Sequence, residues 1–137
     1  MAQWSTLQYY ASAMVLNIHS DASYASERGA KSRATGHYFL GSEPRDNAPI
    51  RLNSAIYTLC NIMKFAASSA TEAELGALFM NAKGGCILRL NHKKLGHPQP
   101  PTPMHCDNAT AAGIANGSVK QQRSRAMEMR YFYICDQ

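Results

Sequence analysis

The chain has only nine acidic residues, so the position of each carboxylate is informative. Asp21 lies near the end of a stretch whose polarity alternates, and Asp107 directly follows a short stretch, 104–106, with strand character. Glu72 and Glu74 lie in the first turn of a segment with helical periodicity. If the two stretches pair as neighbouring strands, both aspartates lie at one edge of a sheet, and a helix packed on that sheet can bring a glutamate to them.

Carboxylates that converge in this way bind hard divalent cations such as Mg²⁺ through oxygen. Two such ions about 4 Å apart can activate water and stabilise the leaving oxygen when a phosphodiester bond is cut. Both aspartates also have a purely structural interpretation. Asp107 or Asn108 suits the N-cap of the next helix, and Asp21 can simply end a strand.

The two glutamates have structural interpretations of their own. Glu72 follows Ser69, and Glu74 follows Thr71, at the spacing of a capping box. Acids in a first helical turn also interact favourably with the helix dipole. The helical wheel does not choose between Glu72 and Glu74, because both lie at the border of the apolar stripe.

The elements that would position these acids follow from periodicity and from turn-forming residues. Strands are predicted at 14–23, 35–40, 55–60 and 104–106, with a polar turn at 27–31. Helices are predicted at 71–83, where Gly84-Gly85 would end the first of them, at 109–115 and at 126–135, with more helix within 87–95. The stretch at 97–103 contains four prolines and is expected to be extended.

This order of elements predicts an α/β fold. Hairpin-connected strands followed by a crossover helix imply a mixed sheet, with three antiparallel strands and one parallel strand, flanked by helices. Residues 1–13 are interpreted as a leader or linker, and residues 14–137 as one domain.

Composition adds weaker constraints. A hydrophobic content of 45% excludes a disordered tail, and a net charge of +5 favours polyanionic partners. The four cysteines form no CxxC pair, which favours reduced thiols in an intracellular protein. No apolar run reaches the roughly 18 residues of a membrane span, and no signal peptide is recognised, so no membrane partner is expected.

Five short segments occur in an order that resembles the ribonuclease H domain of copia-type LTR retrotransposons, which belongs to a polyprotein with reverse transcriptase. The segments are Ser20-Asp21-Ala22, Arg33-Ala34-Thr35-Gly36, Ser69-Ala70-Thr71-Glu72-Ala73-Glu74-Leu75, His105-Cys106-Asp107-Asn108 and Arg123-Ser124-Arg125-Ala126-Met127-Glu128-Met129-Arg130-Tyr131. The resemblance covers residues 14 to 137. It implies a ribonuclease H-like fold with a mixed five-stranded sheet, and an active site with three aspartates and one glutamate.

The resemblance assigns catalytic and metal-binding roles to Asp21, Glu74 and Asp107. Glu74 is preferred over Glu72 because the family's glutamate precedes an apolar or aromatic residue, here Leu75. Glu72 then remains as the capping partner of Ser69. The implied cofactor is Mg²⁺, with Mn²⁺ as an alternative.

The chain departs from the family pattern in several places. Ala70 and Leu75 replace the usual Ser and Tyr, and Gln121 and Ala126 stand where many members have His. The family's fifth strand and last helix, which carries the fourth carboxylate, would follow Gln137, so the domain is interpreted as incomplete at its C-terminus. Glu128 is an additional acid near this position, although surface pairing with Arg125 or Arg130 is the preferred interpretation.

Basic residues are expected to bind nucleic acid. The proposed contacts to the phosphates of an RNA–DNA hybrid are Lys120, Arg123, Arg125 and Arg130, with Lys93 and Lys94 as a second basic pair. RNA would be distinguished by its 2′-hydroxyl groups. Tyr24 and Tyr38 could stack on sugars, although packing is the preferred interpretation.

Two functions therefore remain open. The first is a metal-dependent endoribonuclease that cuts the RNA strand of an RNA–DNA hybrid, with the reverse transcriptase portion of the polyprotein as partner. Its expected location is the cytoplasm, a virus-like particle or the nucleus. The second is a catalytically weak fragment that binds nucleic acid or supports its neighbour. An integrase or transposase core is disfavoured, because its acids occur in the order Asp, Asp, Glu.

Overall fold

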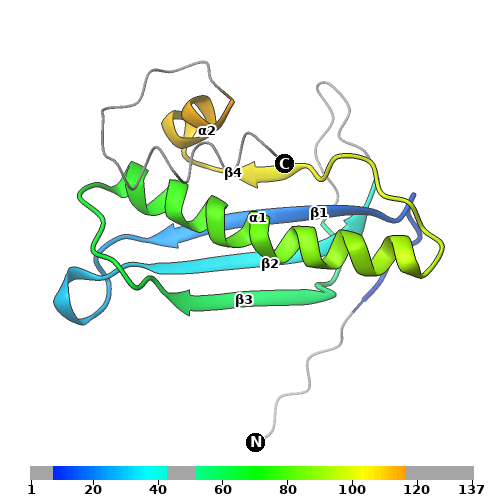
Figure 1. Cartoon of the computed structure of the whole chain (residues 1–137), viewed down its shortest axis with the longest axis horizontal. Helices are drawn as coiled ribbons and strands as arrows, with labels where there is room; N and C mark the ends of the chain where they lie inside the picture. Colours follow the sequence, from blue (N-terminus) through cyan, green and yellow to red (C-terminus); the bar gives the residue numbers. More distant parts are fainter. Residues whose placement is uncertain (1–7, 43–51, 117–137) are drawn as a thin grey trace, which may run out of the picture.

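The structure, a computed structural model, describes residues 8–42 and 52–116. These residues form an α/β fold with a four-stranded mixed sheet in the order β3-β2-β1-β4 (Figure 1). The elements are β1 (Val15–Ser23), a 3₁₀ turn (Arg28–Ala30), β2 (Arg33–Gly41), β3 (Tyr57–Ile62), α1 (Ala70–Lys94), β4 (Met104–Cys106) and α2 (Ala109–Ala115). The pairs β1–β2 and β2–β3 are antiparallel, and β1–β4 is parallel, which confirms the predicted sheet type.

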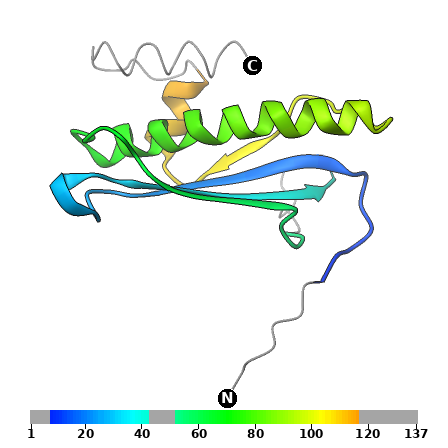
Figure 2. The ribbon, with the colours of Figure 1, turned by 60° about the horizontal axis from the view of Figure 1, so that its bottom comes forward.

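Both helices lie on the same face of the sheet (Figure 2). The core forms between α1 and the central strands, where Leu16 and Ile18 of β1 pack with Tyr38 of β2. A second cluster joins α1 to α2 through Leu75, Leu78, Ala111 and Ile114. The long helix α1 therefore links the hairpin strands to the parallel strand β4 and the short helix α2.

Strand β1 is buried more completely than its alternating polarity predicts. Residues Val15 to Ile18 are all buried, and the alternation begins only at the exposed His19. Asn17 is a buried polar residue in this stretch, and its Oδ1 lies 3.1 Å from Nε2 of His105 on β4. The alternation of buried and exposed residues that the sequence predicts is thus present only in the second half of β1.

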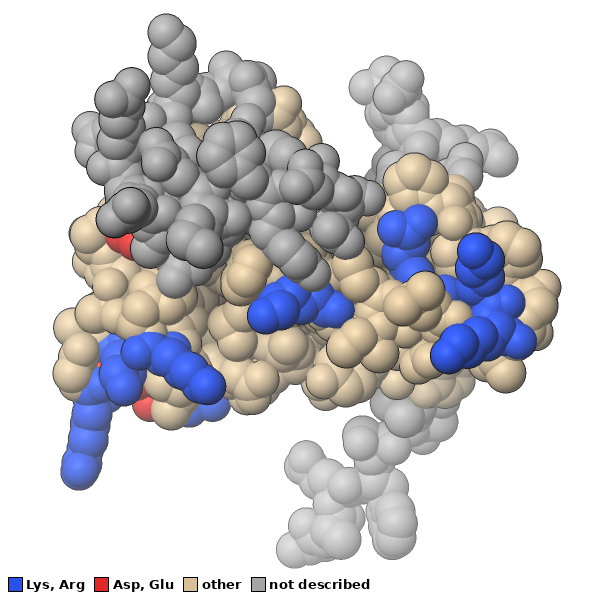
Figure 3. Space-filling view, in the orientation of Figure 1, with Lys and Arg blue, Asp and Glu red and all other residues tan. Residues whose placement is uncertain are grey.

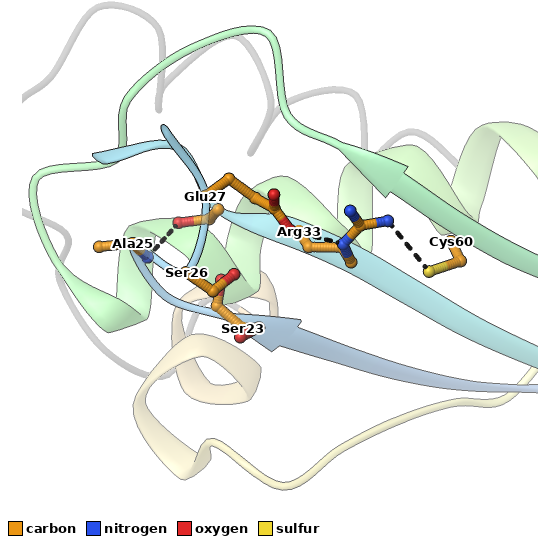
Figure 4. Close-up of polar contacts among 7 residues, drawn as sticks. Ser23, Ala25, Ser26, Glu27, Arg33 and Cys60 are labelled. Carbon is orange, nitrogen blue, oxygen red and sulfur yellow. Dashed lines mark hydrogen bonds and ion pairs between the residues drawn. The ribbon is translucent and has the colours of Figure 1, made fainter. Parts of the chain in front are cut away.

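The hairpin between β1 and β2 turns where polar residues and glycine predicted it. Gly29 has φ 72°, a conformation that glycine adopts without strain, and the backbone N–H of Glu27 donates to Lys31 across the turn. Figure 4 shows Arg33 of β2 between Glu27 of the turn and Cys60 of β3, with Nε 2.8 Å from Glu27 Oε1 and Nη1 3.5 Å from Cys60 Sγ. Arg33 thereby connects the turn to the edge strand.

Helix α1 runs for 25 residues, through the two glycines that were expected to end it at Lys83. The reason lies in the close approach of the helix to the sheet. A Cβ at Gly84 would lie 2.7 Å from Tyr38 Oη, and a Cβ at Gly85 would lie 2.7 Å from Ile18 Cδ1. The glycines therefore serve helix–sheet packing, and the helix ends instead at the cap residue Leu95.

The other boundaries differ less from the predictions. β2 is longer at both ends than 35–40, and β3 begins and ends two residues later than 55–60. β4 and α2 have the predicted bounds. The helix predicted at 126–135 lies outside the described residues. Among the described helices, none is both long enough and apolar enough to span a membrane.

Candidate metal site

The parallel pairing of β1 with β4 brings the two aspartates to the same edge of the sheet. Ser20 of β1 is in register with Cys106 of β4, and Asp21 and Asp107 are the residues that directly follow these two partners in the sequence. The first turns of α1 pass over this edge, which places Glu74 beside both strands. Three elements that are distant in the sequence thus bring their carboxylates together.

Glu74 lies in the middle of this arrangement. One ligand atom from each of Glu74, Cys106 and Asp107 lies within 4.8 Å of the others. Asp21 is outside this close group but shares a donor with it, because the backbone N–H of Ala22 lies 2.9 Å from Asp21 Oδ1 and 3.3 Å from Glu74 Oε1. Asp21 is exposed to solvent, whereas Glu74 is buried.

Burial and like charge act together on the Glu74 carboxyl group. Desolvation, followed by repulsion from Asp21 and a smaller repulsion from Asp107, raises the pKa of Glu74 from its ordinary value of 4.5 to about 7. The N–H of Ala22 opposes this rise, because it donates to the charged form. Near neutral pH, Glu74 therefore changes its protonation state readily, and a bound cation would favour the charged form.

Cys106 was not among the predicted site residues. Its thiol donates to Glu74 Oε2 over 3.7 Å, and burial raises its pKa to about 11, so it is protonated at neutral pH. The one sequence signal was its position directly before Asp107. That signal is weak, because the contact depends on how α1 crosses the end of β4.

The two neighbouring glutamates of α1 have different partners. Oε2 of Glu72 accepts hydrogen bonds from the backbone N–H and the hydroxyl of Ser68. Ser69 is the N-cap and accepts from the N–H of Glu72 at 3.1 Å. Half of the predicted capping box is therefore present, but the carboxylate binds Ser68 where Ser69 was expected. Glu74 is left to face the aspartates.

The capping alternative for Asp107 is also resolved. The N-cap of α2 is Asn108, whose Oδ1 accepts from the N–H of Ala111 at 2.9 Å. Asp107 is exposed and is not the cap. The donor set at the sheet edge thus consists of three carboxylates and one protonated thiol. Carboxylate oxygens suit a hard divalent cation, so the residues fit Mg²⁺ or Mn²⁺ without selecting between them.

Most of the predicted nucleic-acid contacts belong to the C-terminal segment of the chain. Lys120, Arg123, Arg125, Arg130 and the additional acid Glu128 lie outside the described residues.

The second basic pair is described. Lys93 and Lys94 are exposed in the last turn of α1, where Figure 3 shows basic side chains gathered. Tyr38 is fully buried and donates to Asn81, which excludes the stacking role considered for it. The side chain of Tyr24 is 46% exposed, which is compatible with stacking on a sugar.

Comparisons with protein-family models, with curated proteins and with solved structures found no match for this chain.

Proposed function

We propose that this protein is a ribonuclease H with a ribonuclease H-like fold, which cuts the RNA strand of an RNA–DNA hybrid with the help of Mg²⁺ or Mn²⁺. The observation that carries the proposal is the meeting of Asp21, Glu74 and Asp107 at one edge of the sheet. The motif order resembles the copia-type domain, and the mixed sheet is compatible with four of the five strands that this resemblance implies.

Each acid has a distinct task in this proposal. Glu74 is the buried ligand, and its raised pKa means that protons and cations compete for it near pH 7. Asp107 lies within the same close group, Asp21 lies outside it, and both aspartates are exposed to solvent, where a substrate could reach them. When bound, the metal would supply the chemistry of phosphodiester hydrolysis, which is activation of water and stabilisation of the leaving oxygen.

The proposed substrate follows from charge and shape. Basic side chains neutralise phosphates and position a duplex, but they read no sequence. Discrimination in favour of RNA would come from 2′-hydroxyl groups in the shallow minor groove. Cleavage is therefore expected to have little sequence preference and to spare duplex DNA.

The test is cleavage of a labelled RNA–DNA hybrid by the full 137-residue chain, with and without Mg²⁺. Glu74→Gln removes the central ligand with little change of shape and is expected to lower the rate by at least about a hundredfold, since a lost metal ligand affects the chemical step directly. Glu72→Gln is the matched control, two residues away on the same helix, and is expected to retain most of the activity.

Equal rates for the wild type and Glu74→Gln would contradict the proposed site. A larger loss of activity in Glu72→Gln than in Glu74→Gln would mean that Glu72, and not Glu74, is the metal ligand. Both variants should be compared at a temperature where their circular dichroism spectra match that of the wild type, because Glu72 also binds Ser68 at the start of α1.

One observation favours the second function, a fragment that binds nucleic acid but cuts poorly. The close group contains the Cys106 thiol as its third member, where an efficient site would be expected to contain Asp21. Hybrid binding without Mg²⁺-dependent cleavage would select this alternative. Cleavage that is restored when the chain is extended past Gln137 would instead favour an incomplete active site.

A further inference from the structure

A cavity of about 500 Å³ lies behind the candidate metal site, between α1, β4 and α2. Its size falls in the range of sites for small organic molecules. Most of its walls are apolar. Residues that line it include Leu78, Arg89, Thr102, Met104, Cys106 and Ala112.

Two polar atoms of residues that line this cavity lack hydrogen-bond partners. The Nε atom of Arg89 on α1 is covered by the protein and has no hydrogen-bond partner, and the same is true of the Thr102 hydroxyl. No ion pair of Arg89 is found in the part of the chain that the structure describes. A covered donor without an acceptor destabilises the fold by about 1–3 kcal/mol, so two of them in one cavity wall indicate a missing acceptor.

We propose that this cavity binds a small monocarboxylate with an apolar body. The guanidinium group of Arg89 presents a planar fork of donors, which a carboxylate can accept in pairs. The Thr102 hydroxyl is a further donor on the same cavity wall. Leu78 and Met104 supply the apolar surface that would cover the rest of the ligand.

The charge of the wall argues against a more highly charged ligand. Among the lining residues that the structure describes, Arg89 is the single cationic side chain. A phosphate dianion would therefore remain half-neutralised against apolar carbon, which is unfavourable. A monoanion with an apolar body matches both the charge and the composition of the cavity.

This binding site does not depend on the proposed nuclease function. Cys106 nevertheless connects the two, because it lines the cavity and its thiol donates to Glu74. A ligand in the cavity would contact the side chain that lies against the central acid of the metal site. Occupancy of the cavity would therefore be communicated to Glu74 through a single residue.

The test compares 2-naphthoate with the uncharged 2-naphthamide on the full chain whose methionine methyl groups carry ¹³C. Met104 lines the cavity, whereas Met63 is buried in a separate cluster around Ala34 and Ala77. We expect 2-naphthoate to shift the Met104 signal saturably, to leave Met63 unchanged, and to bind at least about tenfold more tightly than the amide, which corresponds to roughly one charge-assisted hydrogen bond.

Variants assign the preference to individual groups. Arg89→Met should reduce the difference between acid and amide to less than about twofold, since it removes the charge and keeps the length of the side chain. Lys83→Met is the control, because Lys83 lies on the same helix but over the Phe79 ring, outside the cavity lining. Thr102→Val, which is nearly isosteric, should weaken the acid severalfold.

The proposal is overturned if acid and amide bind equally, if Met63 shifts together with Met104, if millimolar 2-naphthoate shifts neither signal, or if Lys83→Met removes the preference as fully as Arg89→Met. Should Arg89→Met fail to fold, Thr102→Val and Ala112→Leu decide. Ala112→Leu fills the cavity and is expected to abolish the Met104 shift for both probes, and an unchanged shift would place the probe elsewhere.

Discussion

At the scale of single residues, the raised pKa of Glu74 shows that its charged form is unfavourable in the metal-free fold. A carboxyl group that is buried beside two aspartates is held in a state that favours its neutral form. A cation would reverse this preference, because it compensates both the desolvation and the repulsion. In the proposed site, the same side chain would therefore couple folding, protonation and metal binding.

This coupling predicts how stability depends on pH without metal. Because the pKa of Glu74 rises from 4.5 in the unfolded chain to about 7 in the fold, its contribution to stability is fully present below pH 4.5 and is lost as the pH rises through 7. The loss is on the order of 3 kcal/mol. Urea unfolding in the presence of chelator at pH 5 and pH 8 should show this loss of stability in the wild type and not in Glu74→Gln. An equal dependence of stability on pH in both proteins would contradict a buried Glu74 carboxyl group that is repelled by the aspartates.

Asp21 supplies the larger part of the repulsion on Glu74. Asp21→Asn removes one charge and keeps an oxygen that can accept from the N–H of Ala22. We expect this variant to stabilise the metal-free protein by about 1 kcal/mol, or a few degrees in melting temperature.

Mg²⁺ should stabilise the wild type by mass action, and Asp21→Asn less. Melting curves of both proteins in chelator and in excess Mg²⁺ provide the measurement. If Asp21 serves only to end β1, the substitution will be neutral or destabilising, and Mg²⁺ will shift neither curve.

At the scale of elements, the sequence was most informative where local signals marked an end. Such signals are the proline-rich stretch before β4 and Asn108 at the start of α2, and the bounds of both elements were predicted correctly. The pairing of β1 with β4 was a conditional expectation, and the structure contains it.

The features that could not be predicted depend on contacts between distant residues. Nothing local shows that Gly84-Gly85 lies against Tyr38 and Ile18, or that Glu72 binds Ser68 where a capping box would use Ser69. The participation of Cys106 likewise depends on the path of α1 over β4. Periodicity left Glu72 and Glu74 equivalent, and the choice between them came from the motif resemblance.

The two glycines of α1 give a direct test of this packing argument. An added Cβ at Gly84 would meet the hydroxyl of Tyr38. The Tyr38 ring is buried and its Oη lies 2.8 Å from Asn81 Oδ1, so the tyrosine side chain is held in place. Gly84→Ala should therefore destabilise the protein by about 1–3 kcal/mol, although alanine raises helix propensity by about 1 kcal/mol.

Gly85→Ala is the matched comparison. Its Cβ would meet the flexible end of Ile18, which can rotate away, so the net change should stay within about 1 kcal/mol. Chemical denaturation of both variants gives the measurement. A stabilised Gly84→Ala would mean that the helix and the sheet are not in the close contact described.

At the scale of the whole molecule, α1 connects the candidate metal site to the second basic pair. Asn81, fully buried, holds the middle of the helix to the sheet, because its Nδ2 donates to Ser20 Oγ and to the Thr35 carbonyl, both at 2.9 Å. Glu74 and Lys94 are separated by twenty residues of one helix, which corresponds to about 30 Å. A ligand that touches both ends must therefore be long.

This span predicts a length-dependent contribution of the second basic pair to hybrid binding. At roughly 3.4 Å per base pair, a duplex positioned at Glu74 needs about nine base pairs to reach Lys93 and Lys94. A hybrid of about 24 base pairs exceeds this span more than twofold. The double substitution Lys93→Gln and Lys94→Gln should weaken the binding of this hybrid and reduce the salt dependence of binding by up to about two phosphate contacts.

A hybrid of about eight base pairs is the internal control. At about 27 Å it is too short for the span, so it should bind the wild type and the double variant equally. Fluorescence anisotropy across a salt series measures both effects. An equal loss for the two hybrids would mean that the lysines act through the general field of the molecule, and no loss for either would mean that they form only a solvated surface at the end of α1.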